Sequence, residues 1–255
     1  MKRCLPEREE TEAMKVSIIT ATYNDAQNLR RIMYQVAKQD YEDIEYIIVD
    51  GASTDETPQV LEEARTLFGE QVRILSEPDQ GIYSAINKGL RMASGELVGC
   101  CFDEYAHAHV VSRMVETIRK EGTDGVHGDL LYMDGERVVR KWHQGQGKLR
   151  FGWMPGHPTF YIRRSIYEKY GYYKEDYKVS ADYEFMVRCL KDGSVKLSYL
   201  PEVLIRMAYG GTSSSGLSAY LVSLKEGHRA LVENGISFAW FTDLCRTVRV
   251  LLQFL

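Results

Sequence analysis

Cysteine is scarce in this chain, and the five cysteines among its 255 residues form no C-x-x-C pair. Their number is odd, and most of them, including Cys100 and Cys101, stand in apolar stretches. Zinc sites and disulfide frameworks use closely spaced or even-numbered cysteines, so this pattern argues against both. We expect reduced thiols.

A surplus of basic residues and a long apolar run are also missing. The 32 Lys and Arg residues are outnumbered by 36 Asp and Glu residues, and the formal net charge is -4. Because nucleic-acid binding draws on positive charge, we expect no nucleic-acid partner. No apolar stretch reaches the roughly 20 residues of a membrane-spanning helix. The charged start, Met1 to Lys15, lacks the apolar core of a signal peptide, so we expect a cytoplasmic protein.

What is present is an ordinary globular composition, 44% hydrophobic and 27% charged, with alternating strand and helix patterns. Such alternation indicates βαβ units and an α/β fold with a mostly parallel sheet flanked by helices. Expected strands cover 16–22, 44–50, 72–76 and 96–103, and expected helices follow Asn24 and Ser53-Thr54-Asp55-Glu56 and cover 83–93 and 110–120.

The pattern changes after Gly122. We expect a hairpin over 125–140 around Asp134-Gly135, a helix over 182–191 and a strand over 195–207 that Pro201 breaks. The expected division is a disordered lead (1–14), a catalytic domain (15–209) with a nucleotide-binding half (15–103) and an acceptor-side half (104–209), and a C-terminal tail of amphipathic helices (210–255).

Two of the expected strands run into an aspartate, Asp50 and Asp103. A carboxylate is hard to bury in the middle of an apolar strand, but at the strand's end it emerges at the carboxyl edge of a parallel sheet. Open α/β sheets bind ligands at this edge. Two acids delivered there suggest a site for a nucleotide and its metal ion.

Four motifs stand in order along the chain: SIITATYN (17–24), VDGASTD (49–55), SEPDQGIY (76–83) with Asn87-Lys88-Gly89, and VSADYE (179–184). They resemble the motifs of family 2 glycosyltransferases, inverting enzymes with the Rossmann-like GT-A fold that use nucleotide-diphospho-sugars. The similarity extends to about Met207. The family's processive Q-x-x-R-W signature is missing, which points to transfer of a single sugar.

The resemblance implies a uracil contact from the loop Thr22-Tyr23-Asn24 and a hydrogen bond from the base to Asp50. The nucleotide-binding residues that it implies further are Ser53, Asp79, Gly81, Asn87 and Lys88. Gly81 is expected in a turn that needs positive φ. Simpler roles stay open, since Asn24, Ser53 and Asp55 could cap helices and Lys88 could be an ordinary solvated lysine.

Asp103 occupies the position where the family carries Asp-x-Asp or Asn-x-Asp, which implies Mg²⁺ or Mn²⁺ bound against the diphosphate. This chain reads Cys101-Phe102-Asp103-Glu104, so the first acid is absent. A thiolate is a poor ligand for Mg²⁺, but Asp103 with phosphate oxygens and water could hold the ion, with Glu104 in reserve. A metal-weak or inactive site, with Cys100 and Cys101 filling the core, stays open.

Asp182 is the candidate catalytic base, because an inverting transfer needs one carboxylate to take the acceptor's proton. Glu184 competes with it from a different helix face. The stretch Met154–Phe160 resembles the family's acceptor-side loop, so His157 is expected to contact the acceptor or the diphosphate. Glu184 is also expected on the acceptor side. Asp182 as a mere helix N-terminal charge and His157 as a packing residue stay open.

Two further segments could control access to the site. The Gly-rich stretch 145–152 between Trp142 and Trp153 could close as a lid. The tail combines apolar residues with Arg246 and Arg249, and could lie on an acidic membrane at the inner face of the plasma membrane. Packing on the catalytic domain or in a homodimer is the alternative.

These features predict a glycosyltransferase that moves one sugar from a nucleotide-diphospho-sugar, expected to be a UDP-sugar, to a hydroxyl of a surface polysaccharide or lipid-linked glycan. A nucleotidyltransferase or a dinucleotide-binding domain would need a Gly-rich loop after the first strand, and Ala21-Thr22-Tyr23-Asn24 supplies none. A relative that binds nucleotide or a protein partner without transfer stays open.

Overall fold

Nine strands join in one sheet within the residues that this computed structural model describes, 13–210 and 217–253. The sheet order is β3-β2-β1-β4-β8-β6-β9-β5, with β7 beside β6. The lead expected over 1–14 and the linker after residue 210 lie almost wholly outside the described residues. The strands are β1 (Val16–Thr22), β2 (Ile44–Asp50), β3 (Val72–Ser76), β4 (Leu97–Cys100), β5 (Glu104–Tyr105), β6 (Gly125–Asp134), β7 (Arg137–Trp142), β8 (Tyr161–Arg163) and β9 (Leu197–Ala208).

The first half of the sheet is parallel, as expected. β1 pairs in parallel with β2 on one side and with β4 on the other, and β2 pairs in parallel with β3. All seven residues of β2 are buried, which is why its sequence is a continuous apolar run without alternation.

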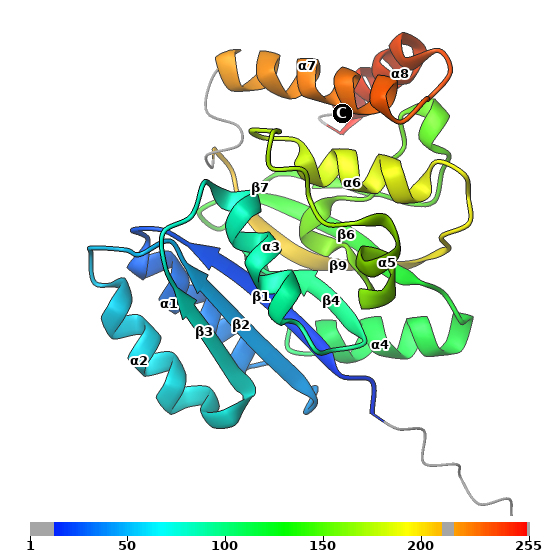
Figure 1. Cartoon of the computed structure of the whole chain (residues 1–255). Coiled ribbons are helices and arrows are strands. Elements are labelled where there is room, and N and C mark those ends of the chain that lie inside the picture. Colours follow the sequence, from blue (N-terminus) through cyan, green and yellow to red (C-terminus); the bar gives the residue numbers. More distant parts are fainter. Residues whose placement is uncertain (1–12, 211–216, 254–255) are drawn as a thin grey trace, which may run out of the picture.

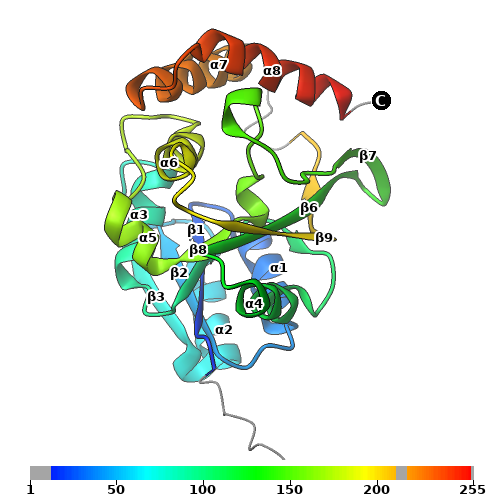
Figure 2. The same cartoon turned by 90° about the vertical axis from the view of Figure 1, so that its right-hand side faces the viewer.

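Helices cover both faces of this sheet (Figures 1 and 2). One core forms between the sheet and the helices α1 (Ala26–Ala37), α2 (Thr57–Phe68) and α4 (Val110–Glu121). A second core forms between the opposite face and α3 (Ile82–Met92), α5 (Arg164–Tyr170) and α6 (Ala181–Leu190). Short 3-10 turns at Gly69–Gln71, Leu149–Phe151 and His157–Thr159 complete the connections.

The second half of the sheet is mixed. β8 runs antiparallel to both β4 and β6, β7 forms the expected hairpin with β6, and β9 is parallel to β6. Pro201 does not break the strand, contrary to expectation. Gly128 pairs with Leu200 and Asp129 with Val203, so the register skips over Pro201, which lacks the amide hydrogen that pairing requires.

The strand expected to reach Asp103 ends earlier, at Cys100. The chain then turns, and Glu104 and Tyr105 pair with β9 as β5. Asp103 therefore lies in a turn rather than at a strand tip. Asp50 is the last residue of β2 and Asp103 follows β4. Because β2 and β4 both pair in parallel with β1, their carboxyl ends share one edge of the sheet.

Two C-terminal helices, α7 (Leu217–Glu233) and α8 (Ala239–Leu252), form a layer over α6 and the loop before β8 (Figures 1 and 2). The tail expected from the sequence is thus packed on the catalytic body. Its helices, like the others in the described residues, fall short of the length and apolarity needed to cross a membrane.

Candidate active site

Asp50 lies at the end of β2, is 0% exposed and organises the loops around it. Its carboxylate accepts hydrogen bonds from the Ser53 hydroxyl (2.5 Å), the Ser76 hydroxyl (2.6 Å) and the Ser53 amide (3.2 Å). The loops after β2 and β3 are therefore tied to one buried acid. The hydrogen bond expected between Asp50 and the nucleotide base would have to use carboxylate oxygens that already accept hydrogen bonds from Ser53 and Ser76.

The loops after β1 and β2 are joined through Asn24 and Asp55. The Asn24 amide donates to the Ser53 hydroxyl at 2.7 Å, and the Asn24 side chain accepts from the Thr54 amide at 2.8 Å. Asp55 accepts from the first amides of both α1 and α2, those of Ala26 and Thr57. Asp55 therefore satisfies helix ends, as the simpler reading held, whereas Asn24 makes no cap bond and instead adopts φ 48°.

Tyr23, Gly51 and Asp79 form an open shelf at the edge of the sheet. Tyr23 is 65% exposed, and a side chain added at Gly51 would lie 3.1 Å from its ring and 2.8 Å from the Asp79 carboxylate. Thr22, the partly exposed last residue of β1, accepts the Gly51 amide through its carbonyl at 2.9 Å. Because Gly51 has no side chain, the exposed ring of Tyr23 is free to stack against a flat ring such as a nucleotide base.

The turn after β3 is held from α3. Asp79 accepts the Gly81 amide at 2.8 Å, and Gly81 has φ 121°, so the positive φ expected there is confirmed. Lys88 donates to the Pro78 carbonyl at 2.8 Å and pairs with Glu77 at 2.9 Å. Lys88 thus supports the turn and places its own positive charge beside it.

Asn87 is buried and fully engaged away from this shelf. Its side-chain amide donates to the Tyr173 carbonyl and to Glu175, both at 2.9 Å, and its oxygen accepts the Tyr173 amide at 3.0 Å. This placement argues against the nucleotide contact expected for it. Asn87 instead fastens the segment before α6 to α3.

Asp103 is a desolvated carboxylate at the carboxyl edge of the sheet. Burial raises its pKa to about 6, although the positive charge of Arg31 and a backbone hydrogen bond at Ala208 act in the opposite direction. Glu104, the expected reserve ligand, is paired with Arg31 at 2.6 Å. Within the described residues no three acidic, histidine or cysteine side chains gather as a ready metal cage.

Cys100 and Cys101 are core residues, as the simpler reading held. Both are buried, and burial raises the pKa of Cys101 to about 12, so its thiol stays protonated and offers no thiolate to a metal. A single carboxylate, Asp103, remains. This suits a Mg²⁺ or Mn²⁺ ion that takes its other ligands from phosphate and water.

Asp182 is at the start of α6, partly exposed, and accepts a hydrogen bond from the Tyr83 hydroxyl at 3.0 Å. His157 lies within electrostatic range of it, and its ring nitrogen Nε2 is 3.0 Å from the Tyr173 hydroxyl. Burial lowers the pKa of His157, which favours the neutral ring despite the charge of Asp182. The sequence-predicted base and the acceptor-side histidine therefore lie together.

A pocket of about 250 Å³ opens beside Asp182, between α6 and the tail helices. Hydroxyl groups and one guanidinium line it together with apolar side chains. The lining residues are Val179, Ser180, Asp182, Tyr183, Ser223, Leu224, Arg246, Thr247 and Val250. The tail thus contributes one wall of the space in front of the candidate base.

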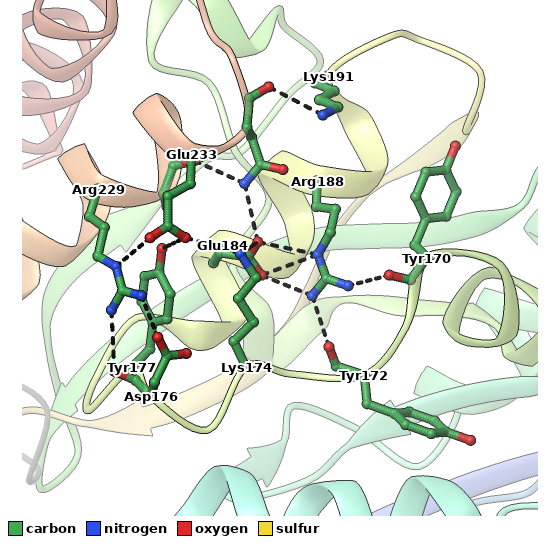
Figure 3. Close-up of polar contacts among 12 residues, drawn as sticks. Tyr170, Tyr172, Lys174, Asp176, Tyr177, Glu184, Arg188, Lys191, Arg229 and Glu233 are labelled. Carbon is green, nitrogen blue, oxygen red and sulfur yellow. Dashed lines mark hydrogen bonds and ion pairs between the residues drawn. The ribbon is translucent and has the colours of Figure 1, made fainter.

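Glu184 is not among the residues that line this pocket, is 0% exposed, and faces Arg188 and Lys174 (Figure 3). Its carboxylate binds Arg188 at 2.8 Å, Lys174 at 3.0 Å and the Asn234 side chain at 3.1 Å. This placement argues against the acceptor contact expected for Glu184. The residue joins α6, the segment before it and the end of α7.

The Gly-rich stretch expected to act as a lid is pinned by α8. The Phe151 carbonyl accepts from Arg249 at 2.9 Å, and the Arg150 carbonyl accepts from Thr242 at 3.2 Å. Gly152 touches the backbone of Cys245 and Arg246 so closely that no Cβ would fit. Opening of this segment would require movement of the tail.

Three functional neighbours escaped the sequence analysis. Ser76 and Tyr83 stand inside a recognised motif, and their hydrogen bonds to Asp50 and Asp182 give them roles. A helical spacing of four residues from Tyr83 to Asn87 could have suggested a shared face. Glu226 in α7 accepts three backbone amides just before Asp182, and no sequence pattern encodes such a contact.

Comparison with known proteins identifies the family of this chain. The model of the family "Glycosyl transferase family 2" matches residues 17–184. Curated relatives named "PGL/p-HBAD biosynthesis glycosyltransferase" from Mycobacterium bovis and Mycobacterium tuberculosis are 30% identical over 205 residues, covering 78% of this chain and 79% of theirs.

Solved structures share the fold at low identity. TarS of S. aureus (residues 1–349), in complex with UDP-GlcNAc, superposes with a TM-score of 0.71 at 20% identity, covering 93% of this chain and 72% of that one. The mannosyltransferase PcManGT from Pyrobaculum calidifontis, in complex with GDP-Man and Mn²⁺, gives 0.65 at 16% identity, covering 95% and 75%. The chain belongs to glycosyl transferase family 2 and is a glycosyltransferase of the GT-A fold.

Proposed function

We propose that this enzyme transfers a single sugar, with inversion, from a UDP-sugar to an acceptor hydroxyl. The observation that carries the proposal is the position of Asp182, whose carboxylate borders an open pocket and is held by the Tyr83 hydroxyl at 3.0 Å. Structural neighbours bound to UDP-GlcNAc and UDP support the choice of donor.

In the proposed step, Asp182 accepts the proton of the acceptor hydroxyl while that oxygen bonds to the anomeric carbon. The bond from the anomeric carbon to the diphosphate oxygen breaks on the opposite face, and UDP leaves with the electron pair. A base of this kind contributes about 10²–10⁴-fold. Tyr83 fixes the carboxylate, and the Tyr23 shelf holds the nucleotide base beside the loop that Asp50 and Ser53 organise.

Asp103 would hold a Mg²⁺ or Mn²⁺ ion, which neutralises charge on the diphosphate when bound. The Mn²⁺ complex of PcManGT supports metal use. Since the described residues gather no set of three ligands here, Asp103 would need phosphate oxygens beside it, and the ion and the nucleotide should bind together. The competing proposal is a relative that binds nucleotide without transferring sugar. Its support is Cys101, a buried thiol that stays protonated at the position where the family has an acid.

We further propose a glycan or lipid-linked acceptor reached from a membrane surface on the cytoplasmic side, with the acceptor in the pocket beside Asp182. The tail exposes a row of large apolar side chains, and Arg249 is exposed beside them. The row consists of Phe238, Trp240, Phe241, Leu244, Val248, Leu251 and Leu252. Aromatic and aliphatic residues flanked by arginine suit the interface of an acidic bilayer. A homodimer through this row is the competing arrangement.

Calorimetric titration with UDP, with and without Mn²⁺, tests the donor site, and UDP release from a panel of UDP-sugars tests turnover. Asp182→Asn should keep UDP affinity and lower turnover by about 10²–10⁴-fold. Absence of UDP binding by the wild type, or full activity of the variant, would contradict the proposal. Turnover that survives a chelator would remove the metal from it.

Co-sedimentation with vesicles of phosphatidylglycerol and phosphatidylcholine tests the surface proposal. We expect binding that weakens with salt and is reduced in the double variant Trp240→Ser/Leu244→Ser. Val232→Ser, which removes an exposed apolar side chain from α7, is the matched control. A dimer in solution that the double variant dissociates, without lipid binding, would favour the homodimer instead.

A further inference from the structure

The segment that leads into the catalytic base is held by the tail. Residues 171–180, which we call the strap, connect α5 to α6 and end immediately before Ala181 and Asp182. The strap has no regular secondary structure, so its backbone depends on contacts from outside. Asn87 of α3 holds its beginning through Tyr173, and Arg188 and Glu184 of α6 bind Tyr172 and Lys174. The last part of the strap, from Tyr177 to Ser180, is held by α7.

Glu226 of α7 binds the last three residues of the strap. Its carboxylate accepts the amides of Lys178 at 2.8 Å, Val179 at 3.0 Å and Ser180 at 3.0 Å. The side chain is buried, with 9% of the residue exposed. Three consecutive amides on one buried carboxylate fix both the position and the direction of the backbone, because each bond is charge-assisted and directional.

Helix α6 does not secure this point by itself. Ser180 is its N-cap residue, and its side chain makes no capping hydrogen bond. The carboxylate that replaces this local contact comes from 46 residues further along the chain. The position of Asp182 at the first turn of α6 therefore depends on the docking of α7.

We propose that Glu226 is a positioning residue for the reaction, setting the Asp182 carboxylate against the acceptor hydroxyl from within the tail. This proposal rests on the proposed role of Asp182 as the base. It makes the tail a part of the catalytic apparatus in addition to a wall of the acceptor pocket. A displacement of the base by about 1 Å can lower turnover 10²-fold, so one buried contact is sufficient to matter.

Glu233, on the same helix, provides a matched control. It pairs with Lys174 at 3.0 Å and accepts the Tyr177 hydroxyl at 3.0 Å, so it also ties α7 to the strap (Figure 3). Its contacts are with side chains, lie further from Asp182 along the chain and are more exposed. A purely structural role for both glutamates would make their variants behave alike.

The test compares Glu226→Gln and Glu233→Gln in the full-length protein. Glu226→Gln keeps the shape of the side chain and one acceptor oxygen. Its NH2 group, however, replaces the other oxygen and faces a backbone N–H, so two donors oppose each other. We expect UDP affinity within twofold of wild type in both variants. UDP release, measured with whichever UDP-sugar of a panel raises the wild-type Tm, should show a kcat reduced about 10–100-fold in Glu226→Gln only. Glu226→Asp should restore part of the loss.

Equal kcat in the two variants, or a loss of UDP affinity that accounts for the slower turnover, would overturn the positioning role. Hydrogen exchange supplies a readout that needs no activity. The amides of residues 178–184 should exchange faster in Glu226→Gln and stay protected in Glu233→Gln. Unchanged exchange in Glu226→Gln would refute the contact itself. A wild type without nucleotide binding would instead refute the proposed function, and the exchange result would still stand.

Discussion

Asp103 has to be charged to hold a metal ion, yet its surroundings favour the neutral acid. Its pKa is raised to about 6 by burial, with Arg31 only partly compensating. The family's first acid at this point would add a second negative charge, and the buried, protonated thiol of Cys101 adds none. A binding site with one desolvated carboxylate is expected to attract the ion only when the diphosphate supplies further oxygens.

Substitution of Asp103 should therefore separate stability from function. Because the folded-state pKa is above the ordinary value near 4, this group favours folding below about pH 4 and loses that contribution as pH rises through about 6. Asp103→Asn should thus be more stable than wild type at pH 7.5 without ligand, by on the order of 1–3 kcal/mol, and equal at pH 4. It should also lose the Mn²⁺-dependent part of UDP binding.

Urea unfolding at the two pH values, followed by titration with UDP and Mn²⁺, measures both effects. Glu104→Gln is the control, since Glu104 is the neighbouring carboxylate and is paired with Arg31 at 2.6 Å. In the wild type, affinity for the UDP–Mn²⁺ pair should fall by up to tenfold per pH unit below about pH 6. An Asp103→Asn protein that still binds the pair as wild type does would remove this residue from the metal site.

At the scale of elements, the shelf that we propose for the nucleotide base is made by loops that follow β1, β2 and β3. Hydrogen bonds from Gly51 to Thr22 and from Glu77 to Asp50 continue the strand pairing beyond the sheet edge. Asn24 and Ala52 both have positive φ, 48° and 61°, although neither is glycine. Strained backbone of this kind persists where surrounding contacts hold it, and it often marks a ligand site.

Gly51→Ala should damage this shelf selectively. The new Cβ would lie 2.8 Å from the Asp79 carboxylate and 3.1 Å from the Tyr23 ring, so both side chains must move. We expect UDP affinity at least tenfold weaker, with a Tm change of only a few degrees because the strands are untouched. Calorimetry with UDP and a thermal scan are the measurements.

The neighbouring substitution Ala52→Gly is the control for this experiment. It removes a Cβ from a residue at φ 61°, which relieves backbone strain without introducing a clash. Its UDP affinity should stay within about threefold of wild type. Equal UDP affinity in Gly51→Ala and wild type would show that Tyr23 and Asp79 do not form the base shelf.

The parallel half of the sheet was predictable because β2 and its neighbours are short apolar runs that end in turn residues. Such runs, separated by helices, are typical of buried parallel strands. The end of β4 was not, because Cys101 and Phe102 are apolar whether or not they pair with a neighbour. Asp182 and His157 were predictable only through motif resemblance. The inward turn of Asn87 and Glu184 depends on partners near 173 and 234, which no local pattern indicates.

At the scale of the whole molecule, a network of ion pairs joins the tail to the catalytic body. Arg229 pairs with Asp176 and Glu233, and Lys174 bridges Glu233 and Glu184 (Figure 3). Arg188 binds Glu184 and donates to the Tyr172 carbonyl of the strap. The outer pairs are exposed and contribute little each, whereas Glu184 is fully buried. Removal of its charge would leave Arg188 and Lys174 without their central partner.

Glu184→Gln should accordingly destabilise the entire fold rather than one helix. Breaking a buried ion pair by removing one partner costs about 3–5 kcal/mol. The control, Glu168→Gln, breaks a helical pair of the same kind, Arg164 with Glu168, on the exposed surface of α5, and should cost less than about 0.5 kcal/mol. Urea unfolding followed by circular dichroism and by tryptophan fluorescence measures both. A loss below about 1 kcal/mol in Glu184→Gln, or two separate transitions in the wild type, would show that the tail and the catalytic body are not coupled through this carboxylate.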